Sequence, residues 1–437
     1  MTHIPKKCEV LVIGGGPAGS MAAALLAQKG IDVVLLEKAK FPRYTVGESL
    51  IPHFWKFTDA IGASEAIEEA GFIKKAGGFV HWDGVLRTVS FRNFGFTRPA
   101  LHVERAEFDQ ILLDRCKELG TKVIEETTVK GVDNGEDSAI VRYQHTNTKE
   151  KGTIEAQYVI DASGRNVVAG KQHDLIDFDE NFKFQAYWAY FNQSDYLNSK
   201  GEVTAFENRF DDPPMTMISD TGEWGWVWQI VLKDKVSLGA LIPRTHLQKF
   251  KEGGATLEER FLTYIRQTPL TNKLIEEGEL VSKIRTVRDY AYKPQKLAFD
   301  RCYLVGDAAA FFDPINSEGI TIAMYGATVA AWAVEKSLQK PHRSEFYRDT
   351  FCRNLQVRLN LFQLLAFPDE MVPNHLVEQI RESILNQSDD ENYLTLAQLM
   401  LTSRGKDFPE LLASIGLSEK EVCQTMEVPD ELLQALV

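Results

Sequence analysis

The sequence predicts an α/β fold, α+β overall, with a doubly wound domain, a second domain built on an antiparallel sheet, and a helical carboxyl-terminal region. Three stretches carry this prediction: a glycine-rich strand–turn–helix at 8–37, alternating aromatic strands within 181–243, and another strand–turn–helix at 302–338. An apolar, β-branched run followed by glycine and a helix is typical of a parallel βαβ unit, whereas alternation indicates a half-buried strand.

The first stretch has the pattern of a dinucleotide-binding turn. A short apolar run, Val10 to Ile13, precedes glycines at G-x-G-x-x-G spacing and an alanine-rich helix pattern. These glycines are Gly14, Gly16 and Gly19. In such a turn the first glycine permits the tight bend, the second lets the backbone approach a pyrophosphate, and the third lets helix and strand pack closely. The helix then points free N–H groups at the phosphates.

A second strand, Val33 to Leu36, ends at Glu37. A carboxylate at this place binds the hydroxyl pair of a ribose. The glycine spacing alone is a weak signal. Strand, helix, strand and terminal acid together favour a dinucleotide site over a glycine-rich turn without a ligand.

The composition, 44% hydrophobic and 25% charged, is that of an ordinary globular protein, and 437 residues suffice for roughly two to three domains. A net charge of −13 argues against nucleic acid or an anionic membrane as the main partner. No apolar stretch is long enough to span a bilayer and the amino terminus lacks a signal-peptide pattern, so we expect a cytoplasmic protein. The five cysteines are scattered and no H-E-x-x-H pair occurs, so no metal site is predicted.

A loop punctuated by proline and glycine follows Glu37, where a nicotinamide dehydrogenase would continue with another βαβ unit. Arg43 and the Gly47-Glu48-Ser49 turn could wrap a second portion of a cofactor larger than one nucleotide. The alternative is a surface loop that leads into a helix capped at Ser49.

Two adjacent lysines, Lys74 and Lys75, precede the flexible pair Gly77-Gly78. On extended backbone they point to opposite faces, so only one can point inward. An inward lysine would be desolvated, which disfavours its ammonium form and allows it to hydrogen-bond or react as an amine. The alternative is two solvated lysines before a hairpin.

The order of elements in the next segment differs from that of a fold that binds only a nicotinamide cofactor. An amphipathic helix follows Arg105, which is in reach of a phosphate or a flavin edge. Three strands then lead to the polar turn Asp161–Arg165. This order is typical of a flavoprotein with two dinucleotide domains.

The middle segment is predicted to form a separate substrate domain. Within its alternating strands, Trp226 and Trp228 share one face of the sheet. Two indoles on one sheet face are more often core than site, and both interpretations stay open at this point.

The last informative stretch places Gly306 and Asp307 at the carboxyl end of a short buried strand, the usual ligand edge of an open α/β sheet. Asp307 could accept a ribitol-type hydroxyl. Pro314 to Gly319 leads into a helix whose first N–H groups could face an isoalloxazine carbonyl or a small anion, or simply be capped. From Arg343 onward we predict helices and no chemistry.

We therefore predict a division into four parts. They are a first part of the cofactor domain (1–175), the substrate domain (176–283), a second part of the cofactor domain (284–340) and the helical region (341–437).

Seven motifs together resemble the flavin-dependent halogenases, within a larger group that also contains aromatic hydroxylases and geranylgeranyl reductases. They are GGGPAG (14–19), VGESLIP (46–52), the lysine and glycines around Lys75, V-x-R-x-x-F-D (103–109), DASGR (161–165), DYAY (289–292) and VGDAAAFFDPINSEG (305–319). The first, fifth and last mark only the broad group. Lys75 and the tryptophan strand are the discriminating features.

With the residue patterns above, this resemblance implies FAD as the cofactor and Lys75 as the catalytic residue. The predicted cofactor-binding residues are Gly14, Gly16, Ala18, Gly19, Glu37, Arg43, Glu48, Ser49, Arg105, Asp161, Gly306, Asp307, Pro314 and Gly319. The predicted substrate or halide side consists of Trp226, Trp228, Ser317 and Glu318.

The resemblance also implies partners and a reaction. Reduced FAD, supplied by a separate flavin reductase, and oxygen would convert a halide held near the Ser317–Gly319 backbone into hypohalous acid. Lys75 would hold this oxidant by a hydrogen bond or as a haloamine and present it to an electron-rich ring. Trp226 and Trp228 would wall the flavin from the substrate.

Two positions depart from the family pattern. Val231 stands where the family motif W-x-W-x-I-P has proline, which leaves an aromatic monooxygenase open. Asn316 stands where tryptophan-specific members have glutamate, so the sequence more resembles members that act on phenols, pyrroles or carrier-bound acyl groups. The alternatives are an FAD-dependent reductase or dehydrogenase of the geranylgeranyl reductase type, an aromatic monooxygenase, and a non-catalytic FAD-binding protein.

Overall fold

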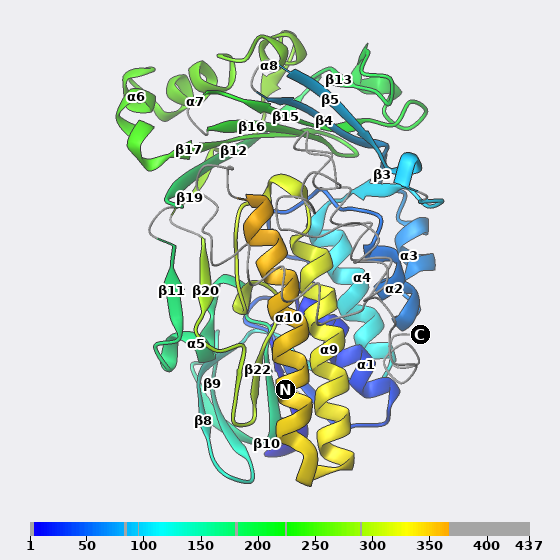
Figure 1. The fold of residues 1–437 in the computed structure, drawn as a ribbon, viewed down its shortest axis with the longest axis vertical. Helices are drawn as coiled ribbons and strands as arrows, with labels where there is room; N and C mark the ends of the chain where they lie inside the picture. Colours follow the sequence, from blue (N-terminus) through cyan, green and yellow to red (C-terminus); the bar gives the residue numbers. More distant parts are fainter. Residues whose placement is uncertain are drawn as a thin grey trace, which may run out of the picture.

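A computed structural model describes residues 4–82, 85–94, 96–179, 182–222, 225–288 and 291–366. It confirms the α/β class: one mainly parallel sheet with helices packed beside it and one mainly antiparallel sheet above it (Figure 1). Residues 289 and 290 of the DYAY motif and most of the predicted helical region, 367–437, lie outside the described residues.

The first sheet joins strands that are far apart in the chain. β1 pairs in parallel with β2 and β10, and β10 pairs in parallel with β22, so their carboxyl ends meet at one edge. Its strands are, in order, β21 (Ala298–Phe299), β22 (Cys302–Leu304), β10 (Lys151–Asp161), β1 (Lys7–Ile13), β2 (Val33–Leu36) and β7 (Lys122–Ile124), with β9 (Ala139–His145) and β8 (Thr127–Asn134) beside β10. The apolar runs predicted in β1 and β2 are buried because helices cover this sheet.

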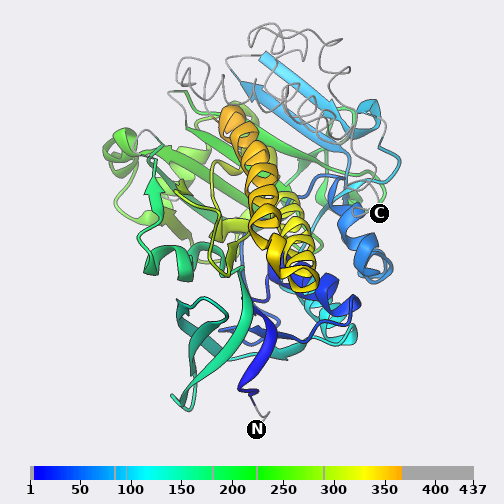
Figure 2. The ribbon, with the colours of Figure 1, turned by 60° about the horizontal axis from the view of Figure 1, so that its bottom comes forward.

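Those helices include α1 (Pro17–Gln28), α4 (Arg105–Glu118), α9 (Gly319–Gln339) and α10 (Ser344–Ala366). α9 and α10 run side by side in both views (Figures 1 and 2). α10 extends to the underside of the second sheet, where Leu361 and Phe362 join the apolar cluster that contains Trp226 and Trp228. Shorter helices are α2 (Phe54–Ile61), α3 (Ser64–Glu69) and α5 (Val168–Gln172).

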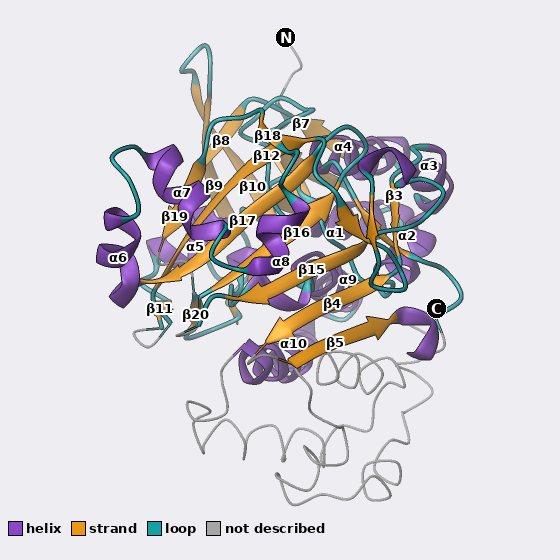
Figure 3. Cartoon of the chain, turned by 90° about the horizontal axis from the view of Figure 1, so that it is seen from above, coloured by secondary structure: helices purple, strands orange, loops and turns teal. Residues whose placement is uncertain are grey.

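The second sheet is antiparallel except where β15 pairs in parallel with β4. Its strands are β18 (Glu279–Leu280), β12 (Phe184–Asn192), β17 (Val236–Pro243), β16 (Trp226–Val231), β15 (Met215–Asp220), β4 (Gly77–Trp82) and β5 (Val85–Ser90), with β19 (Arg285–Arg288) beside β12 (Figure 3). β4 and β5 come from the range predicted as cofactor domain. This sheet is therefore not confined to 176–283.

Small sheets connect these parts: β3 (Ile73–Lys75) with β6 (Ala100–His102), β11 (Ile176–Phe178) with β20 (Tyr292–Pro294), and β13 (Tyr196–Leu197) with β14 (Val203–Thr204). The helical stretch predicted at 248–278 is three short helices, α6 (Leu247–Glu252), α7 (Leu257–Ile265) and α8 (Pro269–Leu274). Phe250 and Phe261 from these helices pack on the face of the second sheet opposite to the tryptophans.

Candidate active site

A cavity of about 810 Å³ extends from the carboxyl ends of the first sheet's parallel strands to the tryptophan face of the second sheet. Its lining includes sixteen of the predicted site residues: Gly14, Gly16, Ala18, Glu37, Arg43, Glu48, Ser49, Arg105, Trp226, Trp228, Gly306, Asp307, Pro314, Ser317, Glu318 and Gly319. Lys75, Gly19 and Asp161 are not part of this lining.

The turn after β1 leaves no room for side chains. Gly14 has φ +100°, and a Cβ there would lie 2.5 Å from the carbonyl oxygen of Ala162. A Cβ on Gly19 would overlap the carbonyl oxygen of Gly14. Gly14 therefore lets this turn pack closely against the backbone at Ala162, and Gly19 lets α1 approach the turn.

The Glu37 carboxylate is fixed at this end of the cavity. Its Oε2 accepts a hydrogen bond from the Gly15 N–H at 2.7 Å, and its Oε1 accepts one from the Ala39 N–H at 2.8 Å. Each carboxylate oxygen can accept more than one hydrogen bond, so capacity remains for a pair of ribose hydroxyls.

Hydrogen bonds and ion pairs of two arginines hold the loop from Arg43 to Glu48 at the cavity. Arg105 forms a bidentate pair with the buried Asp109, at 2.9 and 3.0 Å, and its Nη1 donates to the carbonyl of Val46 at 2.8 Å. Arg43 also reaches Asp109, at 3.2 Å. The loop lines the cavity and does not lead directly into a helix, because the first helix after it begins at Phe54 and has His53, not Ser49, as its N-cap.

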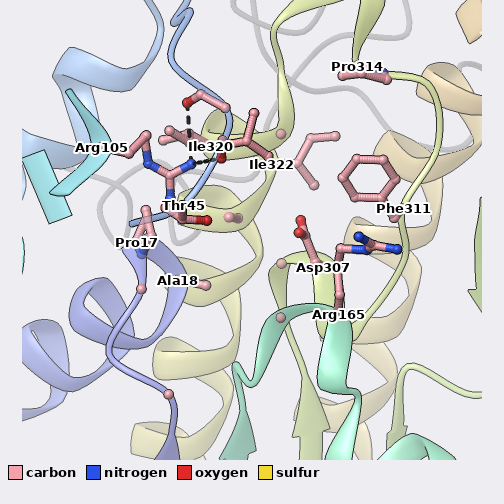
Figure 4. Close-up of a pocket in the computed structure, with 18 of the residues that line it drawn as sticks. Pro17, Ala18, Thr45, Arg105, Arg165, Asp307, Phe311, Pro314, Ile320 and Ile322 are labelled. Atoms are coloured by element: carbon pink, nitrogen blue, oxygen red, sulfur yellow. Dashed lines mark hydrogen bonds between the residues drawn. The ribbon is translucent and has the colours of Figure 1, made fainter. Parts of the chain in front are cut away.

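Asp307 and Arg105 enter the cavity from different walls, and Arg165 lies beside Asp307 (Figure 4). Burial raises the pKa of Asp307 to about 6, while the positive charges of Arg105 and Arg165 act in the opposite direction. Arg165 is a cavity residue that we did not predict, although it belongs to the DASGR motif.

Asp161 differs from the prediction, because its side chain supports the turn and does not line the cavity. Its carboxylate is fully buried and accepts hydrogen bonds from the N–H groups of Ser163, at 2.9 Å, and Ala169, at 2.7 Å. These bonds hold the turn that presents Ala162, Ser163 and Arg165 to the cavity.

The two adjacent lysines of β3 have opposite environments. Lys74 is exposed, whereas Lys75 is only 4% exposed. Lys75 Nζ donates to Ser49 Oγ at 2.9 Å and to the carbonyl of Leu50 at 3.1 Å. Burial lowers the pKa of Lys75 to about 7, against the opposing effect of the Glu318 carboxylate. The amine lies directly behind Ser49, which lines the cavity.

Trp226 and Trp228 lie on the same face of β16, with ring centroids 5.6 Å apart, and both line the cavity. The Trp226 indole N–H donates to Asp313 at 3.3 Å. Trp228 fits because Gly239 stands opposite it on β17, where a Cβ would overlap the indole.

The apolar wall continues beyond the tryptophans into α10, whose Leu359 and Phe362 also line the cavity. We predicted helices and no chemistry from Arg343 onward; α10 is such a helix, and its apolar side chains complete the cavity wall. Helix periodicity gave no hint of which turn of α10 would reach the second sheet.

The turn before α9 brings Ser317 and Glu318 to the same end of the cavity as Lys75. Ser317 has φ +62° and donates from Oγ to Ser49 Oγ at 3.0 Å. Glu318 is buried, and its Oε1 has no hydrogen-bond partner among the described residues. Burial, reinforced by Asp313, raises the pKa of Glu318 well above its usual range.

These features fit FAD. A glycine turn free of side chains and a fixed carboxylate suit the adenosine and pyrophosphate, and the partly exposed Asp307 carboxylate in the cavity wall suits a ribitol hydroxyl. The apolar wall of Trp226 and Trp228 suits a flat ring system. The fold and the cavity thus define an FAD-binding enzyme.

Comparison with known proteins gives the same class. The family of FAD binding domains matches residues 7–349. The chain is 35% identical over 356 residues to the tryptophan 2-halogenase of Chondromyces crocatus, covering 79% of this chain and 65% of that protein. It is 32% identical to the flavin-dependent halogenase ascD of Acremonium egyptiacum (85% and 71% covered) and 30% identical to the flavin-dependent halogenase armH2 of Armillaria mellea (91% and 82%).

Solved structures agree in fold. The myxobacterial chondrochloren halogenase CndH superimposes with a TM-score of 0.74 at 24% identity, covering 97% of this chain and 96% of that one. The flavin-dependent halogenase CmlS gives a TM-score of 0.72 at 26% identity, covering 99% and 77%.

The chain belongs to the flavin-dependent halogenase family, which confirms the family, FAD and the enzyme class predicted from the sequence. These relatives do not favour the reductase, dehydrogenase or monooxygenase alternatives. In the described part of the chain, no helix combines the length and hydropathy that a membrane crossing requires. The same residues contain no cluster of three histidine, cysteine or acidic side chains that could hold a metal.

Proposed function

We propose that this protein halogenates an electron-rich aromatic compound with Lys75 as its catalytic residue. The single observation that carries the proposal is the burial of Lys75 beside the Ser317–Glu318 turn, with its neighbour Lys74 in solvent. A buried amine with a pKa near 7 is neutral in a large fraction of molecules at neutral pH and can act as a base or nucleophile.

When bound, reduced FAD supplies with oxygen the oxidising capacity that turns halide into hypohalous acid in this family. The residues of this chain hold and direct the reactants. Backbone N–H groups at the start of the 21-residue helix α9 are suited to a halide. Glu318 lies at this helix start, and its raised pKa favours the neutral acid, which does not repel an anion.

Lys75 is separated from the cavity by the Ser49 hydroxyl. We propose that the oxidant passes this point and is held at the amine, while Trp226 and Trp228 keep the organic substrate from the flavin. A cavity wall made of indoles, Phe311 and Phe362 would favour a flat, apolar compound.

For the substrate we retain a phenol- or pyrrole-like ring, free or carried by an acyl carrier protein, because Asn316 replaces the glutamate of tryptophan-specific members. One relative is named a tryptophan halogenase, so free tryptophan belongs in the same test. A separate flavin reductase would supply the reduced FAD.

The test is a bromination assay with the full chain, FAD, a flavin reductase, NADH, bromide and air. Phenol, pyrrole-2-carboxylate and tryptophan serve as separate substrates, and products are identified by their mass spectra. We expect a product with the bromine isotope pattern. In Lys75→Ala we expect its rate to fall by a factor on the order of 10² to 10⁴, as for the loss of an acid–base group.

Lys74→Ala is the matched control, because it removes a neighbouring lysine that is in solvent. It should brominate at the parent rate. A product that gains only oxygen would support a monooxygenase and contradict the proposal. Anaerobic saturation of an alkene would support a reductase, with the same consequence.

A further inference from the structure

Four hydroxyl and imidazole side chains from four separate segments connect to Lys75. Lys75 Nζ and Ser317 Oγ both bond to Ser49 Oγ, at 2.9 and 3.0 Å. Ser49 Oγ lies 2.9 Å from Thr216 Oγ1, and Thr216 Oγ1 lies 2.7 Å from His102 Nε2. His102 Nδ1 lies 3.1 Å from the carbonyl oxygen of Val231. Lys75, Ser49, Thr216 and His102 are all buried.

The donor of each hydrogen bond in this network can be assigned by starting from the Val231 carbonyl. A carbonyl only accepts, so His102 Nδ1 carries the proton and donates to Val231. Burial, with the nearby Lys75 charge, lowers the pKa of His102 well below its usual range, so its Nε2 is an acceptor. Thr216 must then donate its only hydroxyl proton to His102.

The direction continues to Lys75. Because the Thr216 proton is already used, Thr216 accepts from the Ser49 hydroxyl, whose single proton is used in turn. Ser49 therefore meets Lys75 and Ser317 as an acceptor. A neutral amine has two N–H groups, and the Ser49 hydroxyl and the Leu50 carbonyl accept both. Among the described residues, the lone pair of the amine then has no hydrogen-bond donor.

We propose that His102, acting through Thr216 and Ser49, is a positioning residue that keeps the Ser49 hydroxyl proton turned away from Lys75 and the amine lone pair open. This inference rests on the proposed catalytic role of Lys75. Without the acceptor that Thr216 provides, the Ser49 hydroxyl could turn and donate its proton to the Lys75 lone pair.

The test compares two substitutions at one position in the FAD-loaded full chain. Thr216→Val has nearly the shape of threonine but cannot accept from Ser49. Thr216→Ser keeps the hydroxyl. The ionisable groups around the amine are His102 on β6 and Glu318 before α9, and both variants leave them in place.

The first readout does not depend on turnover. Lysine labelled with ¹³C at Cε is incorporated, the Lys75 signal is identified by its absence in Lys75→Met, and its titration is followed by NMR. A hydrogen bond donated to the lone pair favours the neutral amine. We therefore expect the Lys75 titration to move to lower pH in Thr216→Val and to match the parent in Thr216→Ser.

The second readout is the bromination rate at pH 8.5, where the amine is neutral in all three proteins. We expect about a tenfold lower rate in Thr216→Val, because the lone pair is occupied, and the parent rate in Thr216→Ser. An unchanged titration in Thr216→Val would overturn the inference whatever the rate, as would a shift in Thr216→Ser equal to that in Thr216→Val. If no protein brominates, the proposed function fails while the titration still decides this inference.

Discussion

The two ends of the cavity differ in the groups that form them, which are mainly backbone groups at one end and mainly side chains at the other. At the nucleotide end, Gly14 and Glu37 act with backbone groups of neighbouring residues, such as the Gly15 N–H. At the other end, Lys75 is held by side chains whose positions differ by up to 268 residues along the chain, as in the hydrogen bond of Ser317 to Ser49. The first end thus consists largely of backbone groups, and the second of hydrogen-bonded side chains.

This difference predicts different responses to substitution. At the nucleotide end, added side-chain volume should lower the affinity for FAD. The Lys75 end should tolerate changes of volume better than changes in hydrogen-bonding groups, and its effects should depend on pH.

The largest expected effect is at the glycine turn. In Gly14→Ala, the new Cβ meets the Ala162 carbonyl and the backbone must keep φ +100°, which costs about 3 kcal/mol or more in total. We expect loss of bound FAD, measured as the flavin absorbance of the purified protein. Gly30→Ala is the control, since Gly30 has φ +77° but no atom within 4 Å of its Cβ position. Equal flavin loss in both variants would show that backbone strain alone accounts for the effect.

A smaller effect is expected at the ribose site. Glu37→Ala removes charge-assisted hydrogen bonds and should weaken FAD binding by about 1.5–3 kcal/mol, roughly 10- to 150-fold. Fluorescence titration of the apoprotein with FAD measures this. Glu9→Ala removes a carboxylate that accepts from the Asp32 N–H on the same sheet, and it should leave the affinity unchanged. An unaltered affinity in Glu37→Ala would remove that carboxylate from the FAD site.

The smallest effect is on stability and depends on pH. The pKa of Lys75 is about 7 in the folded protein, against an ordinary value of 10.5. Between these values the unfolded chain binds more protons, so this lysine disfavours folding most below pH 7 and less as pH rises through this window. Lys75→Met should therefore be more stable than the parent at pH 6, with the advantage smaller by about 1–2 kcal/mol at pH 8.

Thermal unfolding at the two pH values measures this difference. Lys74→Met is the control, because it makes the same substitution at the neighbouring, exposed lysine. A pH-independent difference between Lys75→Met and the parent would mean that the folded amine titrates normally.

The same contrast explains what the sequence could predict. The βαβ unit, the glycines and Glu37 lie within a single continuous stretch, where spacing has one geometric meaning. Strand alternation predicted that only one of Lys74 and Lys75 points inward, and the family resemblance selected Lys75. His102 and Thr216 were missed, since only the pairing of β3 with β6 and of β4 with β15 brings them to Lys75. No local pattern encodes that register.

Ser49 shows most clearly which features of the site the sequence could predict and which it could not. It was predicted from its motif as a cofactor residue, and it does line the cavity. Its hydroxyl, however, bonds to Lys75, Thr216 and Ser317, three residues that no local spacing connects. The motif identified the residue but not the partners of its side chain.

The central claim is that one FAD molecule joins the two ends of this cavity. The most direct test is a crystal structure of the protein with oxidised FAD and bromide, recorded at the bromine absorption edge. We predict adenosine density beside Glu37, the isoalloxazine ring against Trp226 and Trp228, and an anomalous peak near the backbone of Ser317–Gly319. FAD bound elsewhere, or a flavin ring remote from that turn, would contradict the claim.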